Sequence, residues 1–120
     1  MLINLSNHPC GKWGQEQQAT AIQAWGEIED YPFPAVAPQW DENRITQLAD
    51  EIVSDIVTRH GNTSITVHVM GEFCLTHALV LRFKSHGITC VASTSQRMVK
   101  ELSPGNKEVT FHFVRFRQYL

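Results

Sequence analysis

The chain has 120 residues, of which 42% are hydrophobic, and these values predict one domain spanning residues 1–120. Its formal net charge of −2, with histidine neutral, argues against general binding to duplex DNA, which needs a basic surface. No run approaches the roughly 18 apolar residues of a membrane span, and the N-terminal residues lack the basic region of a signal peptide. Cys10, Cys74 and Cys90 form no C-x-x-C pair, so we expect no disulfide framework, no cysteine-based zinc site and a cytoplasmic location.

The N-terminal part of the chain predicts two strands separated by a helix. Residues 2–5 form a short apolar run that ends at a polar turn, as in a buried parallel strand. Residues 15–25 have a helix-forming composition and end at Gly26. Residues 27–33 alternate weakly and end in Pro-Phe-Pro, which favours a strand at the edge of a sheet.

The clearest element is an amphipathic helix that begins after Asp41 and ends near His60. Its apolar residues recur at helical spacing, and Gly61 follows as a stop. These residues are Ile45, Leu48, Ala49, Ile52, Val53, Ile56 and Val57. Residues 64–70 are β-branched at alternate positions and predict the next strand.

The remaining residues predict two more helices and two more strands. Residues 73–86 predict a helix closed by Gly87, and residues 88–92 predict a buried strand. Residues 96–102 are expected to form a short helix. A Pro-Gly-Asn turn then leads to an alternating strand over residues 109–119.

This order of elements predicts an α/β fold of the Rossmann-like three-layer type. We expect a mostly parallel sheet of about five strands with helices on both faces, and a possible antiparallel strand at one edge. The commonest small arrangement has the strand order 2-1-3-4-5, in which ligands bind at the carboxyl ends of the strands, near the reversal between strands 1 and 3. Three polar turns would meet there: Ser6-Asn7-His8, Met70-Gly71-Glu72 and Ser93-Thr94-Ser95.

The first two turns each have a functional and a simpler explanation. Ser6 and Asn7 can hydrogen-bond a ligand and His8 can carry a proton near neutral pH, but the same residues can simply cap a turn. Gly71 permits a positive φ or the close approach of a ligand. Glu72 can contact ribose hydroxyls or a metal, or only cap the following helix, and the cap is the simpler explanation.

The third turn gives the strongest sequence signal for an anion. Ser93, Thr94 and Ser95 precede Arg97 at the head of the predicted short helix, where hydroxyls, amides and a guanidinium can hold a phosphate. An N-cap accounts for one serine but not for the whole group. The other histidines, including His68 inside a strand, form no H-x-H or H-x-x-x-H pair, so no metal and no cofactor is expected.

Three segments carry a family resemblance: LINLSNHP at residues 2–9, VHVMGE at 67–72 and CVASTSQR at 90–97. With them the chain resembles small CRISPR-associated proteins of the Rossmann-like sensor type, similar to CARF domains and to the ring nucleases of type III systems. Ser93 and Arg97 match one common CARF pattern, Asp/Asn-x-Ser/Thr-x-x-x-Arg/Lys. Val91 departs from it, because it stands where Asp or Asn is expected.

The resemblance implies a homodimer that binds the second messenger cyclic oligoadenylate at the carboxyl ends of its strands. It also implies that such a protein can cleave this ligand without a metal, by attack of a ribose 2′-hydroxyl on the next phosphate. The implied contacts to phosphate and ribose are Ser6, Asn7, Ser93, Thr94 and Arg97. His8 would be the acid or base, and Gly71 would let the backbone approach the ligand.

A different class of function also fits the sequence. The chain can be a non-enzymatic α/β module that binds a protein partner through apolar edges, because charged residues are only 18% and Trp13, Trp25 and Trp40 lie outside the clear core stripes. Arg97→Ala would separate the two hypotheses, because a nucleotide site should lose about 1.5–3 kcal/mol of binding. A metal-dependent nuclease ranks last, since Glu72 has no acidic neighbour in the sequence.

Overall fold

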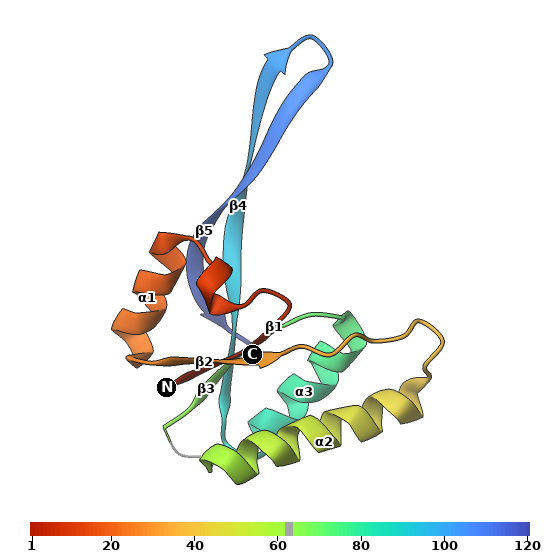
Figure 1. The fold of residues 1–120 in the computed structure, drawn as a ribbon. Coiled ribbons are helices and arrows are strands. Elements are labelled where there is room, and N and C mark those ends of the chain that lie inside the picture. The colour runs from red at the N-terminus through yellow and green to blue at the C-terminus, as the bar shows by residue number, and fades with distance from the viewer. Residues whose placement is uncertain (62–63) are drawn as a thin grey trace.

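A computed structural model describes residues 1–61 and 64–120, and the sheet in these ranges has the strand order β2-β1-β3-β4-β5 (Figure 1). The strands are Leu2–Ser6 (β1), Ile28–Pro32 (β2), Thr66–Met70 (β3), Thr89–Ser103 (β4) and Asn106–Gln118 (β5). The pairs β1–β2, β1–β3 and β3–β4 are parallel, and β4–β5 is antiparallel. The predicted α/β class, strand order and antiparallel edge strand are therefore confirmed.

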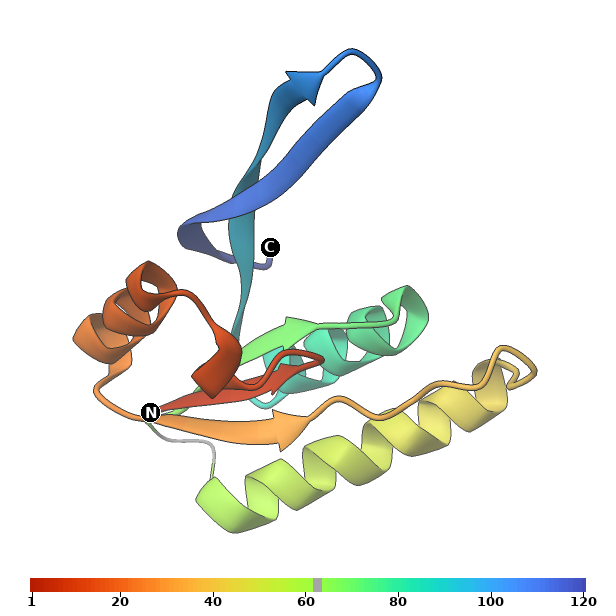
Figure 2. The same ribbon diagram turned by 45° about the horizontal axis from the view of Figure 1, so that its top comes forward.

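Helices cover both faces of this sheet (Figure 2). Gln15–Trp25 (α1) lies on one face, preceded by a short 3-10 helix, Cys10–Lys12. Glu42–His60 (α2) and Phe73–Ser85 (α3) lie side by side on the other face. In the ranges that the structure describes, no helix is long and apolar enough to cross a membrane.

The predicted apolar stripe of α2 faces the larger core. Asp41 caps this helix, its side chain accepting the Arg44 N–H at 3.1 Å, and Gly61 ends it with a positive φ of 67°. The stripe residues Ile45, Ala49, Ile52, Val53 and Ile56 are buried. An ion pair of 2.6 Å between Arg82 and Asp50 joins α3 to α2.

Strand β1 is buried on both faces, but its two faces differ in chemistry. Its side chains alternate between the faces of the sheet, as in any strand. Ile3 and Leu5 belong to the core under α2 and α3. Leu2 packs with Trp13 on the α1 side, where Asn4 and Ser6 are also buried. The side of the sheet that faces α1 therefore carries polar groups in its interior.

The predicted short helix at residues 96–102 is wrong. Strand β4 continues to Ser103 and pairs with β5 in a long hairpin that projects from the body (Figure 1). Gly105 turns the chain back with a φ of 84°, as a Pro-Gly turn requires. Cross-strand pairs such as Lys100 with Glu108 stabilise the extended conformation, and only the distant β5 supplies them.

Candidate functional site

A row of polar side chains crosses the sheet on the α1 side. Asn4 of β1 lies opposite Asp30 of β2 and His68 of β3 in the parallel register. Asn4 is 1% exposed and His68 is 2% exposed, whereas Asp30 lies exposed on the edge strand. Buried polar groups of this kind destabilise a fold unless they are hydrogen-bonded, so their partners decide what the row can do.

The hydrogen bonds of Asn4 determine the orientation of its amide. Its Nδ2 donates to Asp30 Oδ1 and to the His8 carbonyl oxygen, both at 2.8 Å. These partners are acceptors only, so the opposite atom, Oδ1, must be the amide oxygen. That oxygen accepts the Ser6 hydroxyl at 2.8 Å and lies 2.9 Å from His68 Nδ1.

The amide of Asn4 in turn sets the tautomer of His68. Because Asn4 Oδ1 can only accept, His68 carries its proton on Nδ1 and leaves Nε2 as an acceptor. Nε2 lies 3.2 Å from Ser93 Oγ on β4. Ser93 Oγ is also 3.1 Å from Met70 Sδ, but an imidazole nitrogen is a stronger acceptor than a thioether sulfur. The Ser93 hydroxyl therefore donates to His68.

The surroundings of His68 keep its ring neutral. Trp13 packs against it edge-on with ring centroids 5.3 Å apart, and Phe116 does the same at 5.7 Å. Burial among these groups lowers the pKa of His68 to about 4, because the charged form loses its hydration. Near neutral pH the imidazole is therefore an uncharged base.

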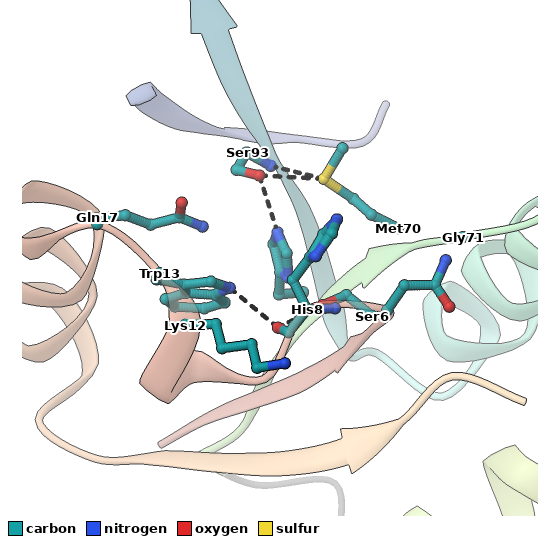
Figure 3. A pocket seen from close by; sticks show the side chains of 11 residues that line it. Ser6, His8, Lys12, Trp13, Gln17, Met70, Gly71 and Ser93 are labelled. Carbon is teal, nitrogen blue, oxygen red and sulfur yellow. Dashed lines mark hydrogen bonds between the residues drawn. The ribbon is translucent and has the colours of Figure 1, made fainter. Parts of the chain in front are cut away.

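A pocket of about 380 Å³ opens at the His68 end of this row (Figure 3). Its walls come from the turn after β1, the segment that leads into α1, the end of β3 and Ser93 in the first part of β4. This volume lies near the lower end of the range for small-molecule sites. The position is the one expected for ligands of a parallel sheet, the carboxyl edge near the reversal between β1 and β3.

The segment between β1 and α1 brings a cation to this pocket. Lys12, at the end of the 3-10 helix, is one of the lining residues. Hydrogen bonds hold the segment in place: Gln18 Nε2 donates to the Cys10 and Trp13 carbonyls, both at 2.9 Å, and the Cys10 N–H donates to Asp30 at 2.9 Å. No aspartate or glutamate is among the lining residues, so the pocket favours an anion.

The structure brings together five of the predicted site residues. Ser6, Asn7, His8, Gly71 and Ser93 all line the pocket. The His8 carbonyl accepts hydrogen bonds from Asn4 and from Trp13 Nε1 at 3.1 Å, and it lies 3.2 Å from Ser6 Oγ, whose proton goes to Asn4 Oδ1. The backbone of His8 is thus a fixed part of the site, while its imidazole is exposed.

The other predicted residues of the third turn do not line this pocket. Thr94 Oγ1 donates to the Arg115 carbonyl at 3.1 Å and accepts the Arg115 N–H at 3.2 Å, and so serves the hairpin. Ser95 and Arg97 are exposed on the hairpin, where Arg97 lies opposite Phe111. Because β4 continues through this segment, no helix N-terminus is present to support the predicted anion site.

The second turn has structural roles. Glu72 accepts the Leu75 N–H at 2.7 Å and caps α3, so the simpler explanation is confirmed. Gly71 has no positive φ. A Cβ at Gly71 would lie 2.5 Å from the Phe33 ring, and this packing explains the glycine without a ligand.

A second cavity, of about 540 Å³, lies near Glu72 but has the opposite charge character. Its lining includes Asp41 and Glu42 besides Glu72. Three carboxylates disfavour a phosphate there. Among the described residues, no group of three or more His, Cys, Asp and Glu side chains is placed to hold a metal ion.

Sequence reasoning missed Asn4, Lys12, Asp30 and His68. A usable signal was present in two of them, because Asn4 and His68 interrupt apolar runs at positions of one parity in β1 and β3. A polar residue inside a strand buried on both faces needs a partner, and two such residues on adjacent strands can supply each other.

Comparison with known proteins identifies a family. No curated protein and no solved structure matches the chain. One family model, described as the uncharacterized protein MJ1673 family, matches residues 1–117. Since the match covers nearly the whole chain, including every element that builds the pocket, this protein belongs to the uncharacterized protein MJ1673 family.

Proposed function

We propose that this protein binds a cyclic oligoadenylate through the pocket over β1, β3 and β4. The observation that carries the proposal is the combination of hydrogen-bond donors and Lys12 with no carboxylate among the lining residues. A phosphodiester linkage needs such surroundings, because its charge must be matched and its oxygens must accept hydrogen bonds. The resemblance of residues 2–9, 67–72 and 90–97 to CARF-like proteins supports the choice of this phosphodiester.

The size of the pocket supports a dimer as the binding unit. A volume of about 380 Å³ accommodates about one nucleotide rather than a ring of several. Two copies related by a two-fold axis would present two equivalent pockets to a symmetric ring, and two-fold dimers are the commonest oligomers. A cytoplasmic location agrees with this proposal, since Cys10, Cys74 and Cys90 are free thiols.

The test is binding of cyclic tri-, tetra- and hexa-adenylate by calorimetry and thermal shift. Lys12→Ala should weaken binding by about 10- to 100-fold, as expected when a charge-assisted hydrogen bond is lost. Lys100→Ala is the matched control, because Lys100 lies on the hairpin opposite Glu108 and should leave affinity unchanged. Absence of binding by all three rings would refute the proposal. A linear product formed in excess chelator would extend it to metal-independent cleavage.

A second candidate function has its own observation, the apolar surface of the hairpin. Phe111 is 66% exposed, and Val99 and Val109 are exposed beside it as a cross-strand pair. A two-stranded ribbon that extends from its sheet is only marginally stable in water, so this surface favours a partner. The proposed partner is a second copy of the chain.

Light scattering with size-exclusion chromatography tests this dimer. Phe111→Ser should shift the protein toward monomer, whereas Thr110→Ser on the opposite face of the ribbon should not. A wild-type protein that is monomeric at high concentration would rule out the hairpin as a self-association surface.

A further inference from the structure

The pocket contains an arrangement that binding alone does not require. Ser93 Oγ lies 3.2 Å from His68 Nε2, and His68 Nδ1 lies 2.9 Å from Asn4 Oδ1. These distances are within reach for proton transfer and orientation, and the order is hydroxyl, imidazole and amide. The same order of roles, with an asparagine as the third group, activates the nucleophile of one class of proteases.

We propose that Ser93 is a nucleophile toward phosphoryl esters, with His68 as its general base and Asn4 as the residue that positions His68. The inference goes beyond the proposed function, because it concerns the reactivity of one hydroxyl and holds for whichever ligand occupies the pocket. His68 and Ser93 both line the pocket, so the pair is in contact with the space a substrate would occupy. A histidine with a purely structural role in the core would not need to line the pocket.

The polar row ensures that the base faces the nucleophile. With Asn4 Oδ1 as an obligatory acceptor, His68 is protonated on Nδ1 and its lone pair on Nε2 points at Ser93. Asp30 accepts from Asn4 Nδ2 at 2.8 Å and so fixes the amide that orients His68. Trp13 and Phe116 hold the imidazole ring from the sides.

The proposed reaction has two balanced steps. Ser93 Oγ attacks phosphorus, the bond from phosphorus to the leaving oxygen breaks, and the hydroxyl proton passes through His68 Nε2 to that oxygen. Water then attacks the phosphoserine, the Ser93 Oγ–P bond breaks, and the proton of water returns through His68 to Ser93. Phosphoryl esters fit better than neutral esters, because Lys12 supplies a positive charge to the same pocket.

A fluorophosphonate probe tests this reactivity without any nucleotide. Serine hydroxyls with a positioned base displace fluoride from phosphorus, and intact-mass and peptide-mapping mass spectrometry locate the adduct. We expect one adduct, on Ser93, that is absent from Ser93→Ala. Ser54→Ala is the matched control, since Ser54 is exposed on α2 across the sheet, and it should label at the wild-type rate.

Variants of the base and of the positioning residue separate catalysis from folding. Among variants that circular dichroism shows to be folded, His68→Gln should slow labelling by about 100-fold or more and Asn4→Ala by about tenfold, following the magnitudes of general-base catalysis. With His68 as the base, the wild-type rate should be constant between about pH 5 and pH 8. In His68→Gln it should rise with pH, because hydroxide replaces the imidazole, while Asn4→Ala should keep the flat profile.

Other groups that face His68 do not blur this profile. Ser93, Trp13 and Phe116 do not titrate in that range, and Asp30 is linked to His68 only through Asn4. His8 and Lys12 also line the pocket, so His8→Ala serves to subtract any contribution from the exposed imidazole. No adduct on Ser93, or equal labelling in folded His68→Gln, would overturn the proposal. Either result would leave the proposed nucleotide binding unaffected, since that proposal is tested separately with cyclic oligoadenylates.

Discussion

The two faces of the sheet use the same strands in opposite ways. Toward α2 and α3, β1 and β3 present Ile3, Leu5, Val67 and Val69, all completely buried. Toward α1, the alternate positions of these strands include polar residues, among them the buried Asn4 and His68. Apolar burial contributes about 1.5–3 kcal/mol per large side chain, whereas a buried polar group at best offsets its own desolvation. One face therefore serves stability, and the other is available for chemistry.

The covering helices follow the same division. Helices α2 and α3 each bury a full apolar stripe, including Ile56 and Phe83. Helix α1 buries only Ala21 among its residues. A helix that packs so little of its own surface leaves space beside it, and the pocket with Ser93 opens there. The contrast teaches that the site exists because the α1 face is packed less completely.

Truncation of a side chain in the apolar core under α2 and α3 should have the largest effect on stability. Phe83→Ala removes a fully buried ring and should lower the free energy of unfolding by about 3–5 kcal/mol, measured by urea denaturation. Leu81→Ala on the same helix is the control, because Leu81 is 53% exposed and should change stability by less than about 1 kcal/mol. Equal losses in the two variants would contradict the assignment of this face as the core.

The second largest effect on stability is expected from acid, through His68 on the face toward α1. His68 has a pKa of about 4 when folded, below the ordinary value of 6.5, so the unfolded chain binds a proton that the folded chain excludes. The contribution of neutral His68 to the free energy of unfolding should therefore be fully present above about pH 6.5. It should fall by about 3 kcal/mol on acidification to about pH 4, at roughly 1.4 kcal/mol per pH unit. His68→Gln should lack this component of the slope in denaturation curves. A slope unchanged in the variant would show that another group is responsible.

Removal of the amide at the centre of the row should have an intermediate effect. Asn4→Ala leaves the buried Nδ1–H of His68 without its partner, and a buried unsatisfied group of this kind costs about 1–3 kcal/mol. Thermal denaturation measures the loss, with Ser54→Ala as the neutral reference. Wild-type stability in Asn4→Ala would mean that water replaces the amide fully.

The smallest effect is expected at the arginine that the sequence favoured. Arg97→Ala changes an exposed residue on the hairpin, outside the residues that line the pocket, so stability should stay within about 0.5 kcal/mol. Ligand affinity, measured by calorimetry, should also be unchanged. A loss as large as that of Lys12→Ala would place the binding surface on the hairpin rather than in the pocket.

The local pattern of the chain was sufficient for most elements. The helix Glu42–His60 was predictable because its cap, its periodic apolar residues and its terminal glycine all lie within the helix itself. The strand order was also predictable, since short parallel crossovers allow few arrangements. The hairpin beyond Ala92 was not, because β4 owes its extended conformation to partners on β5.

The site shows the same limit more sharply. Local sequence sufficed to place Ser6 and Asn7 at a strand end, and so at the correct edge of the sheet. Ser93 lines the same pocket, although β4 continues past it. It did not join Asn4 to His68, because their contact depends on the register between two strands that are 64 residues apart. The sequence by itself determined the α/β fold and the apolar face of the sheet that packs against α2 and α3. Only the tertiary structure decided that Asn4, His68 and Ser93 form one connected chain, since hydrogen bonds across strands exist only once the sheet is assembled.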